Sequence, residues 1–296
     1  MRLTPTESTI LLNALNAADL AQQKALLQMT TGKRVNLPAD DPAAAAMQVQ
    51  TSDQSSNCDQ FLRSISSVSG ELQTADSALN SCVTALQRAI TLGVQGANGT
   101  LSQQDRQALA DEVKGISDQI LGIANLAYNG HFLFAGTADL QKPYVPDPLT
   151  GGITYQGNDQ TNQIEVEQGH TVAMNLPGSQ LFSAPGADLF QALSTLSDAL
   201  ENGQAVDTAT QLVRNAFDQL TSSRVFYGST ISQLESDQTF LQSEKVQLQQ
   251  NTNDNIGVDM NVAASNLVNA QNARDAALAA AAQSSSLSLL DYLGKN

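Results

Sequence analysis

The fold of this chain is decided by residues 58–89, which read CDQFLRSISSVSGELQTADSALNSCVTALQRA. Apolar residues recur at every seventh position of this stretch, and a second apolar row is interleaved with the first. The first row is Cys58, Ile65, Leu72, Leu79 and Leu86, and the second is Phe61, Val68, Ala75, Cys82 and Ala89. Two apolar positions in each heptad are the pattern of a helical coiled coil. The stretch therefore predicts a long helix that buries one face.

A second heptad row follows in the C-terminal half of the chain. Its members are Val213, Leu220, Tyr227, Leu234, Leu241 and Leu248. The row beside it is mixed in polarity, with Phe217, Arg224, Ile231, Gln238 and Lys245. A mixed row favours one face of a helical bundle over a purely two-stranded zipper. The predicted bundle seam consists of Ile65, Leu72, Leu79, Leu86, Leu220, Leu234, Leu241 and Leu248.

Both ends of the chain also have helical spacing. Thr4 and Pro5 form a helix start, Gly32 ends that first helix, and a last, Ala-rich helix runs from Val258 to Leu293. Isolated helices of this kind are marginal in water. We therefore expect the two ends to pack together and against neighbouring subunits. The residues expected at this assembly interface are Leu11, Leu15, Ala18, Leu267, Ala270, Leu278, Leu289, Leu290 and Leu293.

A short charged joint separates the first two predicted helices. Asp41 followed by Pro42 is a helix start, because an acid caps the helix and suits its dipole. Capping thus explains Asp40 and Asp41 without a metal or an acid/base role. Lys33 and Arg34 leave two interpretations open, since they either pair with carboxylates of a neighbouring subunit or are simply solvated.

The middle of the chain changes its pattern twice. Gly93 and Gly96 are expected to break the second helix, and a capping motif beginning at Ser102 starts a third. From about residue 130, turns separate short runs that favour strands, namely residues 152–155, 163–167 and 171–174.

The predicted fold is mainly α. It is a long antiparallel helical coiled-coil bundle built from both chain ends, with a small β-rich inserted domain. The expected domains are a terminal coiled coil of residues 1–35 with 258–296, a helical bundle of residues 36–137 with 187–257, and a β-rich outer domain of residues 138–186.

Composition and motifs argue against several classes of function. The chain carries 14 Lys and Arg against 29 Asp and Glu, for a formal net charge of -15, so nucleic acid and anionic membranes are poor partners. No apolar run predicts membrane insertion, and the first residues do not form a cleavable secretory signal. His131 and His170 lack nearby ligand residues, and Cys58 and Cys82 fall on the apolar seam. We predict no cofactor, no metal and no enzymatic activity.

Three stretches together resemble a known family. They are MRLT at residues 1–4, TTGKRVNLPADDP at residues 30–42, and NGHFLFAGT at residues 129–137. The chain resembles the hook-associated protein 3 family of the flagellin superfamily, whose members join the bacterial flagellar hook to its filament. In flagellins the Asp-Asp pair is usually followed by Ala-Ala-Gly, whereas Pro42 follows it here. The family more often has Arg at the position of His131.

The resemblance implies a structural subunit of the extracellular flagellum. The terminal helices would line an inner tube and the β-rich insert would point outward. Implied partners are hook-associated protein 1, flagellin, copies of the chain itself in a ring, and an export chaperone with the flagellar type III export apparatus. Two alternatives are a short flagellin that forms the filament itself and, more remotely, an exported effector or hydrolase.

Overall fold

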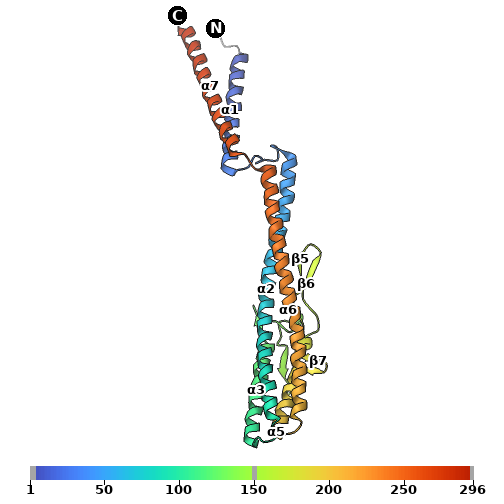
Figure 1. The fold of residues 1–296 in the computed structure, drawn as a ribbon. Coiled ribbons are helices and arrows are strands. Elements are labelled where there is room, and N and C mark those ends of the chain that lie inside the picture. Colours follow the sequence, from blue (N-terminus) through green and yellow to red (C-terminus); the bar gives the residue numbers. More distant parts are fainter. Residues whose placement is uncertain (1–4, 149–151, 294–296) are drawn as a thin grey trace. The chain divides into compact units, whose positions relative to one another are not determined.

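The structure is a computed structural model that describes residues 5–148 and 152–293, with side chains described for residues 9–148 and 152–283. Helices make up most of it (Figure 1). They are α1 (Pro5–Thr31), α2 (Pro42–Gly96), α3 (Gln103–Ala124), α4 (Gly178–Leu181), α5 (Leu189–Asn202), α6 (Val206–Ile256) and α7 (Met260–Leu293). The predicted mainly α fold with a small strand-containing insert is confirmed.

The chain forms two compact units. The terminal unit contains the described residues up to Asn57 and from Ser243 onwards, and the central unit is Cys58–Gln242. The helices α2 and α6 contribute residues to both units. The division into three domains that the sequence suggests stays a prediction.

The heptad rows form the core of the central unit. Every apolar position of the first row from Ile65 to Leu86 is fully buried, and so are Leu220 and Leu234 on α6. Leu241 is also buried, and Leu248, in the terminal unit, retains only 8% of its exposure. Burial of branched side chains at this density stabilises a helix pair by about 1.5 to 3 kcal/mol for each side chain.

Arg224, one of the polar residues in the mixed row of α6, bonds directly to α2. Its guanidinium donates two hydrogen bonds to the carboxylate of Asp76, at 2.9 and 3.0 Å, and a third to Asn80 Oδ1 at 3.0 Å. Asp76 and Asn80 both lie on α2, so this bidentate pair links the two long helices at the edge of their apolar seam. Such a fork geometry favours one register of α6 on α2.

The helix α2 ends at Gly96, within the glycine-rich stretch where the sequence predicted a break, but Gly93 lies inside the helix and does not break it. Both glycines lie where another helix approaches closely. A Cβ atom at Gly93 would collide with Thr210 of α6, and one at Gly96 would collide with Leu200 of α5. Close packing of helices inside the central unit therefore requires glycine at both positions, and Gly96 is in addition the last residue of α2.

The helix α3 begins at the predicted capping box and packs against α5. Asp105 N donates to Ser102 Oγ at 3.2 Å, and Ser102 N donates back to the Asp105 carboxylate at 3.3 Å. The inward face of α3 consists of Ala110, Val113, Ile116, Ile120 and Ala124, all buried. The helix α5 is capped by Asp188 and ends at Gly203, whose φ of 68° suits glycine.

The strands of the insert pair as short antiparallel hairpins. Within the described residues they form β1 (Ala127–Tyr128) with β2 (His131–Phe132), β3 (Tyr144–Pro146) with β4 (Ile153–Tyr155), β5 (Gln163–Glu167) with β6 (His170–Ala173), and β7 (Ser183–Ala184) with β8 (Ala187–Asp188). The runs at residues 152–155, 163–167 and 171–174 correspond to β4, β5 and β6. Buried Tyr144 packs its ring against Tyr155, Phe182 and Phe190, which anchors the insert.

The two cysteines lie on the buried seam, as their heptad positions suggested. Cys58 is 4% exposed and Cys82 is fully buried. Burial raises the pKa of the Cys82 thiol to about 12. Because the thiolate is the reactive form, Cys82 is chemically inert near neutral pH and acts as a small apolar side chain.

Truncation of a seam residue is expected to destabilise the central unit. Leu79→Ala removes a fully buried side chain and should lower the free energy of unfolding by about 2 to 5 kcal/mol, through lost burial and the cavity left behind. Urea unfolding followed by circular dichroism measures this. The control is Leu140→Ala, at a residue 75% exposed, which should change stability by less than about 0.5 kcal/mol. Equal effects of the two substitutions would contradict the assignment of the seam.

Helical glycines should respond to alanine according to their surroundings. Gly115 and Gly122 lie inside α3 with nothing within 4 Å of an added Cβ, so Gly115→Ala and Gly122→Ala should each stabilise the chain by about 0.5 to 1 kcal/mol. Gly96→Ala should destabilise it, because the new methyl group meets Leu200. Thermal unfolding of the three variants tests the difference in sign. Stabilisation by Gly96→Ala would refute the close-packing explanation.

Candidate assembly surface

The two terminal helices pack side by side and antiparallel within the terminal unit (Figure 1). Their contact is made mostly by alanines. Ala18 and Ala25 are buried on α1, and Ala263 and Ala270 are buried on α7. Small side chains let two helix backbones approach closely but bury little apolar area. The pair is therefore held by a narrow seam, at roughly 25 cal/mol for each Å² of apolar surface removed from water.

The expected interface residues divide between this seam and the surface. Ala18 and Ala270 are buried, and Leu11, Leu15 and Leu267 are half-buried. Leu278 is 42% exposed. The side chains of Leu289, Leu290 and Leu293 lie outside the described residues. Assembly through these nine residues stays a prediction, and several of them already serve the contact between α1 and α7.

Further apolar side chains on the terminal helices point into solvent, and the sequence reasoning missed them. Leu20 is 66% exposed and Leu27 is 43% exposed. Each follows a buried alanine by two residues, which places it about 200° round the helix on the opposite face. Other large apolar residues exposed on these helices are Ile10, Leu12, Leu26, Met260, Val262 and Val268. A search of the sequence for a second row of apolar residues, on the opposite face of each terminal helix, could have found them.

A shallow groove runs between the two terminal helices. It has a volume of about 440 Å³ and is lined by Ala21, Lys24, Ala25, Gln28, Asn266, Asn269 and Ala270. Nearby, Arg274 Nε lies 2.7 Å from Asp19 Oδ1. Both partners of this ion pair are about half exposed, so it contributes little to stability. The groove shows that side chains do not fill the space between α1 and α7 over this stretch.

The joint after α1 is tied to the chain just before α7. Gly32 adopts a φ of 67°, which ends the helix, and its carbonyl accepts a hydrogen bond from Val258 N at 3.1 Å. Arg34 N donates to Ile256 O at 2.6 Å. Beneath these bonds, Val35, Ala44 and Ile256 form a small buried cluster. Backbone bonds and apolar packing together hold the start of α2 beside the end of α6.

The two aspartates of the joint act as local hydrogen-bond acceptors. Asp40 accepts from Lys24 Nζ at 2.8 Å and from the backbone N–H groups of Asn36 and Leu37. The Lys24 hydrogen bond is the main reason that the pKa of Asp40 falls from 3.8 to about 2. Asp41 caps α2 by accepting from Ala44 N at 3.1 Å, and this bond lowers the pKa of its carboxyl.

Arg34 has partners within the chain that the sequence reasoning did not consider. It donates to Asp41 Oδ2 at 3.1 Å and to the carbonyl of Asn255 at 2.8 Å. It therefore bridges the start of α2 and the end of α6. Lys33 is exposed, and its backbone pairs with Gly257. Pairing of Lys33 and Arg34 with carboxylates of a neighbouring subunit stays a prediction.

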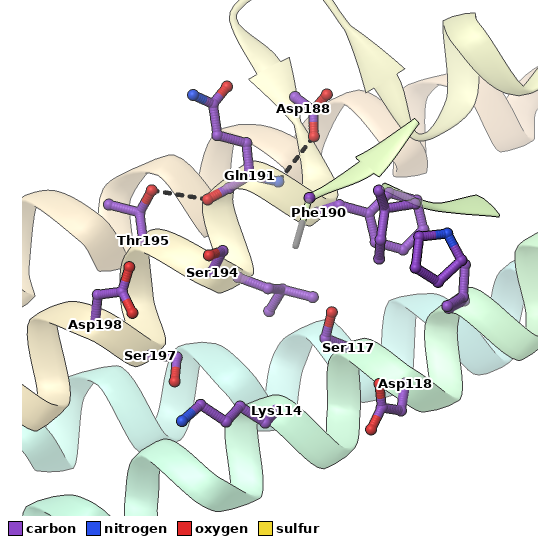
Figure 2. A pocket seen from close by; sticks show the side chains of 15 residues that line it. Lys114, Ser117, Asp118, Asp188, Phe190, Gln191, Ser194, Thr195, Ser197 and Asp198 are labelled. Atoms are coloured by element: carbon purple, nitrogen blue, oxygen red, sulfur yellow. Dashed lines mark hydrogen bonds between the residues drawn. The ribbon is translucent and has the colours of Figure 1, made fainter. Parts of the chain in front are cut away.

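A cavity lies in the central unit between α3, α5 and the β3–β4 hairpin (Figure 2). It measures about 670 Å³. Asp118, Asp188 and Asp198 bring carboxylates to it, and Asp188 accepts from Gln191 N at 2.8 Å as the cap of α5. Lys114 pairs with Glu201 at 2.5 Å. The described lining includes no histidine or cysteine, so its residues do not form a nucleophile and base pair of the Ser–His or Cys–His kind.

The two histidines lie on the surface of the insert. His131 Nδ1 lies 2.8 Å from Asp139 Oδ2, and His170 Nε2 lies 3.2 Å from Gln233 Nε2. In the described part of the chain, no three His, Cys, Asp or Glu side chains converge as metal ligands do. Among the helices described, none is both long and apolar enough to cross a membrane.

Comparison with known proteins points to one family. Residues 3–139 match the model of the bacterial flagellin N-terminal helical region. Flagellar hook-associated protein 3 of Salmonella typhimurium is 30% identical over 233 residues, which cover 70% of this chain and 72% of that protein. The chain belongs to the flagellar hook-associated protein 3 family. The Escherichia coli hook-associated protein 3 is 27% identical over 88% of this chain and 90% of its own length.

Solved structures agree with this hook-associated protein 3 assignment at the level of the fold. The flagellar junction protein FlgL of Legionella pneumophila has a TM-score of 0.62 at 15% identity, covering 71% of this chain and all of that chain. Flagellins match more weakly, and flagellin B of Vibrio anguillarum matches over 41% of this chain and 32% of its own length. The fold of this chain is thus shared with the Legionella pneumophila protein.

The pKa of Asp40 should depend on Lys24. A lowered pKa stabilises the joint above about pH 4, and this stability is lost as pH falls towards 2, because protonation removes the acceptor. In Lys24→Met the pKa of Asp40 should rise towards 3.8, whereas Lys24→Arg should keep it low. Carboxyl NMR titration measures both variants. An unchanged pKa in Lys24→Met would show that the Lys24 contact is not formed in solution.

Proposed function

We propose that this chain is a structural subunit that forms the junction between the bacterial flagellar hook and filament. In this role it binds hook-associated protein 1 on one side and flagellin on the other, and it forms a ring with copies of itself. The similarity to hook-associated protein 3 carries the position at the junction, and the apolar surface that α1 and α7 leave uncovered carries the self-association. The proposed activity is binding and not catalysis.

The uncovered surface supports self-association. A helix that is apolar on more than one side is normally buried. The contact between α1 and α7 uses one face of each helix, and Leu20 and Leu27 lie on the other side of α1. Covering these side chains requires a further helix, and neighbouring copies of the same pair supply one. Assembly then replaces water on the exposed apolar side chains with protein, which favours association.

The names of the relatives support the position of the subunit. Flagellar hook-associated protein 3 of Salmonella typhimurium aligns over most of both chains, and the Legionella pneumophila protein with the same fold is named a junction protein. The family resemblance also implies the extracellular flagellum as the location. Export through the flagellar type III apparatus with a chaperone belongs to the same proposal.

A deletion strain tests the role at the junction. We expect cells without this chain to build hooks and to release flagellin into the medium, and we expect the wild-type chain to restore attached filaments. Attached filaments in the deletion strain would refute the proposal. Growth of long filaments from the purified chain alone, after seeding, would favour the alternative of a short flagellin.

Variants of α1 test the surface itself in the same strain. Leu20→Asp with Leu27→Asp should abolish filament attachment because charges then face the neighbouring helix. Thermal unfolding of the single chain should change by less than about 0.5 kcal/mol, since both side chains are already exposed. The matched control is Leu20→Met with Leu27→Met, which keeps both exposed side chains apolar and should restore filaments. Full function of the Leu20→Asp with Leu27→Asp variant would exclude this face from assembly.

A further inference from the structure

The seam between α2 and α6 changes character inside the terminal unit. On α2, the positions that continue the apolar row between Ala44 and Cys58 are Gln48, Thr51 and Ser55, all half-buried. The next seam positions along α2, from Ile65 to Leu86, are fully buried apolar residues. Over residues 45–57 the helix therefore has polar side chains where a bundle normally has apolar ones.

The facing part of α6 is almost as polar. Between buried Leu241 and buried Ile256, the inward side chains include Leu248, Thr252 and Asn255, and only Leu248 is apolar and buried. A groove of about 190 Å³, partly open to solvent, lies between the two helices here. Its lining is Gln48, Thr51, Ser52, Ser55, Ser56, Leu248, Gln249 and Thr252. A polar space of this size accommodates water molecules rather than interlocking side chains.

The hydroxyl groups around this groove do not link the two helices. Thr51 Oγ1 donates to Met47 O at 2.9 Å, and Ser56 Oγ donates to Ser52 O at 2.8 Å. On α6, Thr252 Oγ1 donates to Leu248 O at 2.9 Å. These bonds return to the helix that carries the hydroxyl, a pattern that slightly destabilises and bends helices. They leave the helix pair with little direct attraction across the groove.

Both ends of this polar segment are packed more firmly. At one end lies the cluster of Val35, Ala44 and Ile256, reinforced by the bonds of Arg34. At the other end, Cys58 and Leu241 are buried, and the central unit begins. The mostly polar part of the seam is therefore confined to residues 45–57 of α2 and 243–255 of α6.

We propose that this polar segment is a flexible region of the helix pair. Within it α2 and α6 separate locally, while both ends of the segment stay packed. Local opening becomes more frequent as the number of buried apolar contacts falls. This part of the helix pair therefore opens more often than the apolar seam. The opening gives the α1–α7 pair freedom to reorient when copies of the chain assemble. This last consequence rests on the proposed function, whereas the local opening does not.

Hydrogen exchange on the purified full chain tests the opening. Amides of residues 46–57 and 243–255 should exchange at least about tenfold faster than those of residues 65–90, because the latter lie in the apolar seam. Thr51→Leu with Ser55→Leu fills the groove with apolar groups and should slow exchange in both polar stretches by about tenfold. Thr51→Val, a smaller change of shape, should slow it less.

The matched control adds the same apolar groups away from the seam. Gln50→Leu with Gln54→Leu, at exposed positions of α2, should leave exchange unchanged. Equal exchange rates in the polar segment and in residues 65–90 of the wild-type chain would overturn the proposal. So would a groove-filling variant that folds normally and exchanges as fast as the wild type.

The deletion strain tests the consequence for assembly. The Thr51→Leu with Ser55→Leu variant should attach fewer filaments than the Gln50→Leu with Gln54→Leu control. Normal attachment of filaments by a variant whose amide exchange is slowed would overturn the role of the polar segment in assembly. It would leave the proposed position at the junction intact, because that position is tested by the wild-type chain alone.

Discussion

Burial of one continuous apolar row between α2 and α6 is the constraint on which the central unit depends. The row on α2 has no exposed surface at Ile65, Leu72, Leu79 and Leu86. On α6, Leu220 and Leu234 are also fully buried. The other features of this unit follow from that close approach. Glycine is needed at Gly93 because Thr210 lies where a side chain would go, and the Arg224 pair with Asp76 lies at the edge of the seam.

Apolar packing is distributed unevenly along the chain. Apolar packing is dense in the central unit. Over residues 45–57 and 243–255 the inward side chains mostly carry hydroxyl and amide groups instead. Between α1 and α7 the apolar contact is a narrow seam. A single chain gains least from burial in its terminal helices, and those helices also expose the most large apolar side chains. In a subunit that must assemble, these exposed apolar side chains can still be buried against other copies, and their burial then stabilises the assembly.

The joint between α1 and α2 shows how polar contacts complement this packing. Asp41 serves both as the helix cap and as a partner of Arg34, which also reaches the carbonyl of Asn255. Asp40 receives Lys24 from α1. Residues that adjoin one another in the sequence thus connect three separate helices at one place. These exposed pairs add little stability individually, but together they define the geometry at which the chain turns.

The sequence by itself determined the helices, the caps and the family. Heptad spacing, Asp41 before Pro42, the capping box at Ser102 and the strand-favouring runs of the insert act over a few residues, so they can be read from neighbouring positions. Only the tertiary structure decided the role of Gly93 and Gly96, the partners of Arg34, the second apolar face of α1 and the groove beside Thr51. Each of these depends on which distant segment lies opposite, and a local pattern contains no information about that distance or that partner.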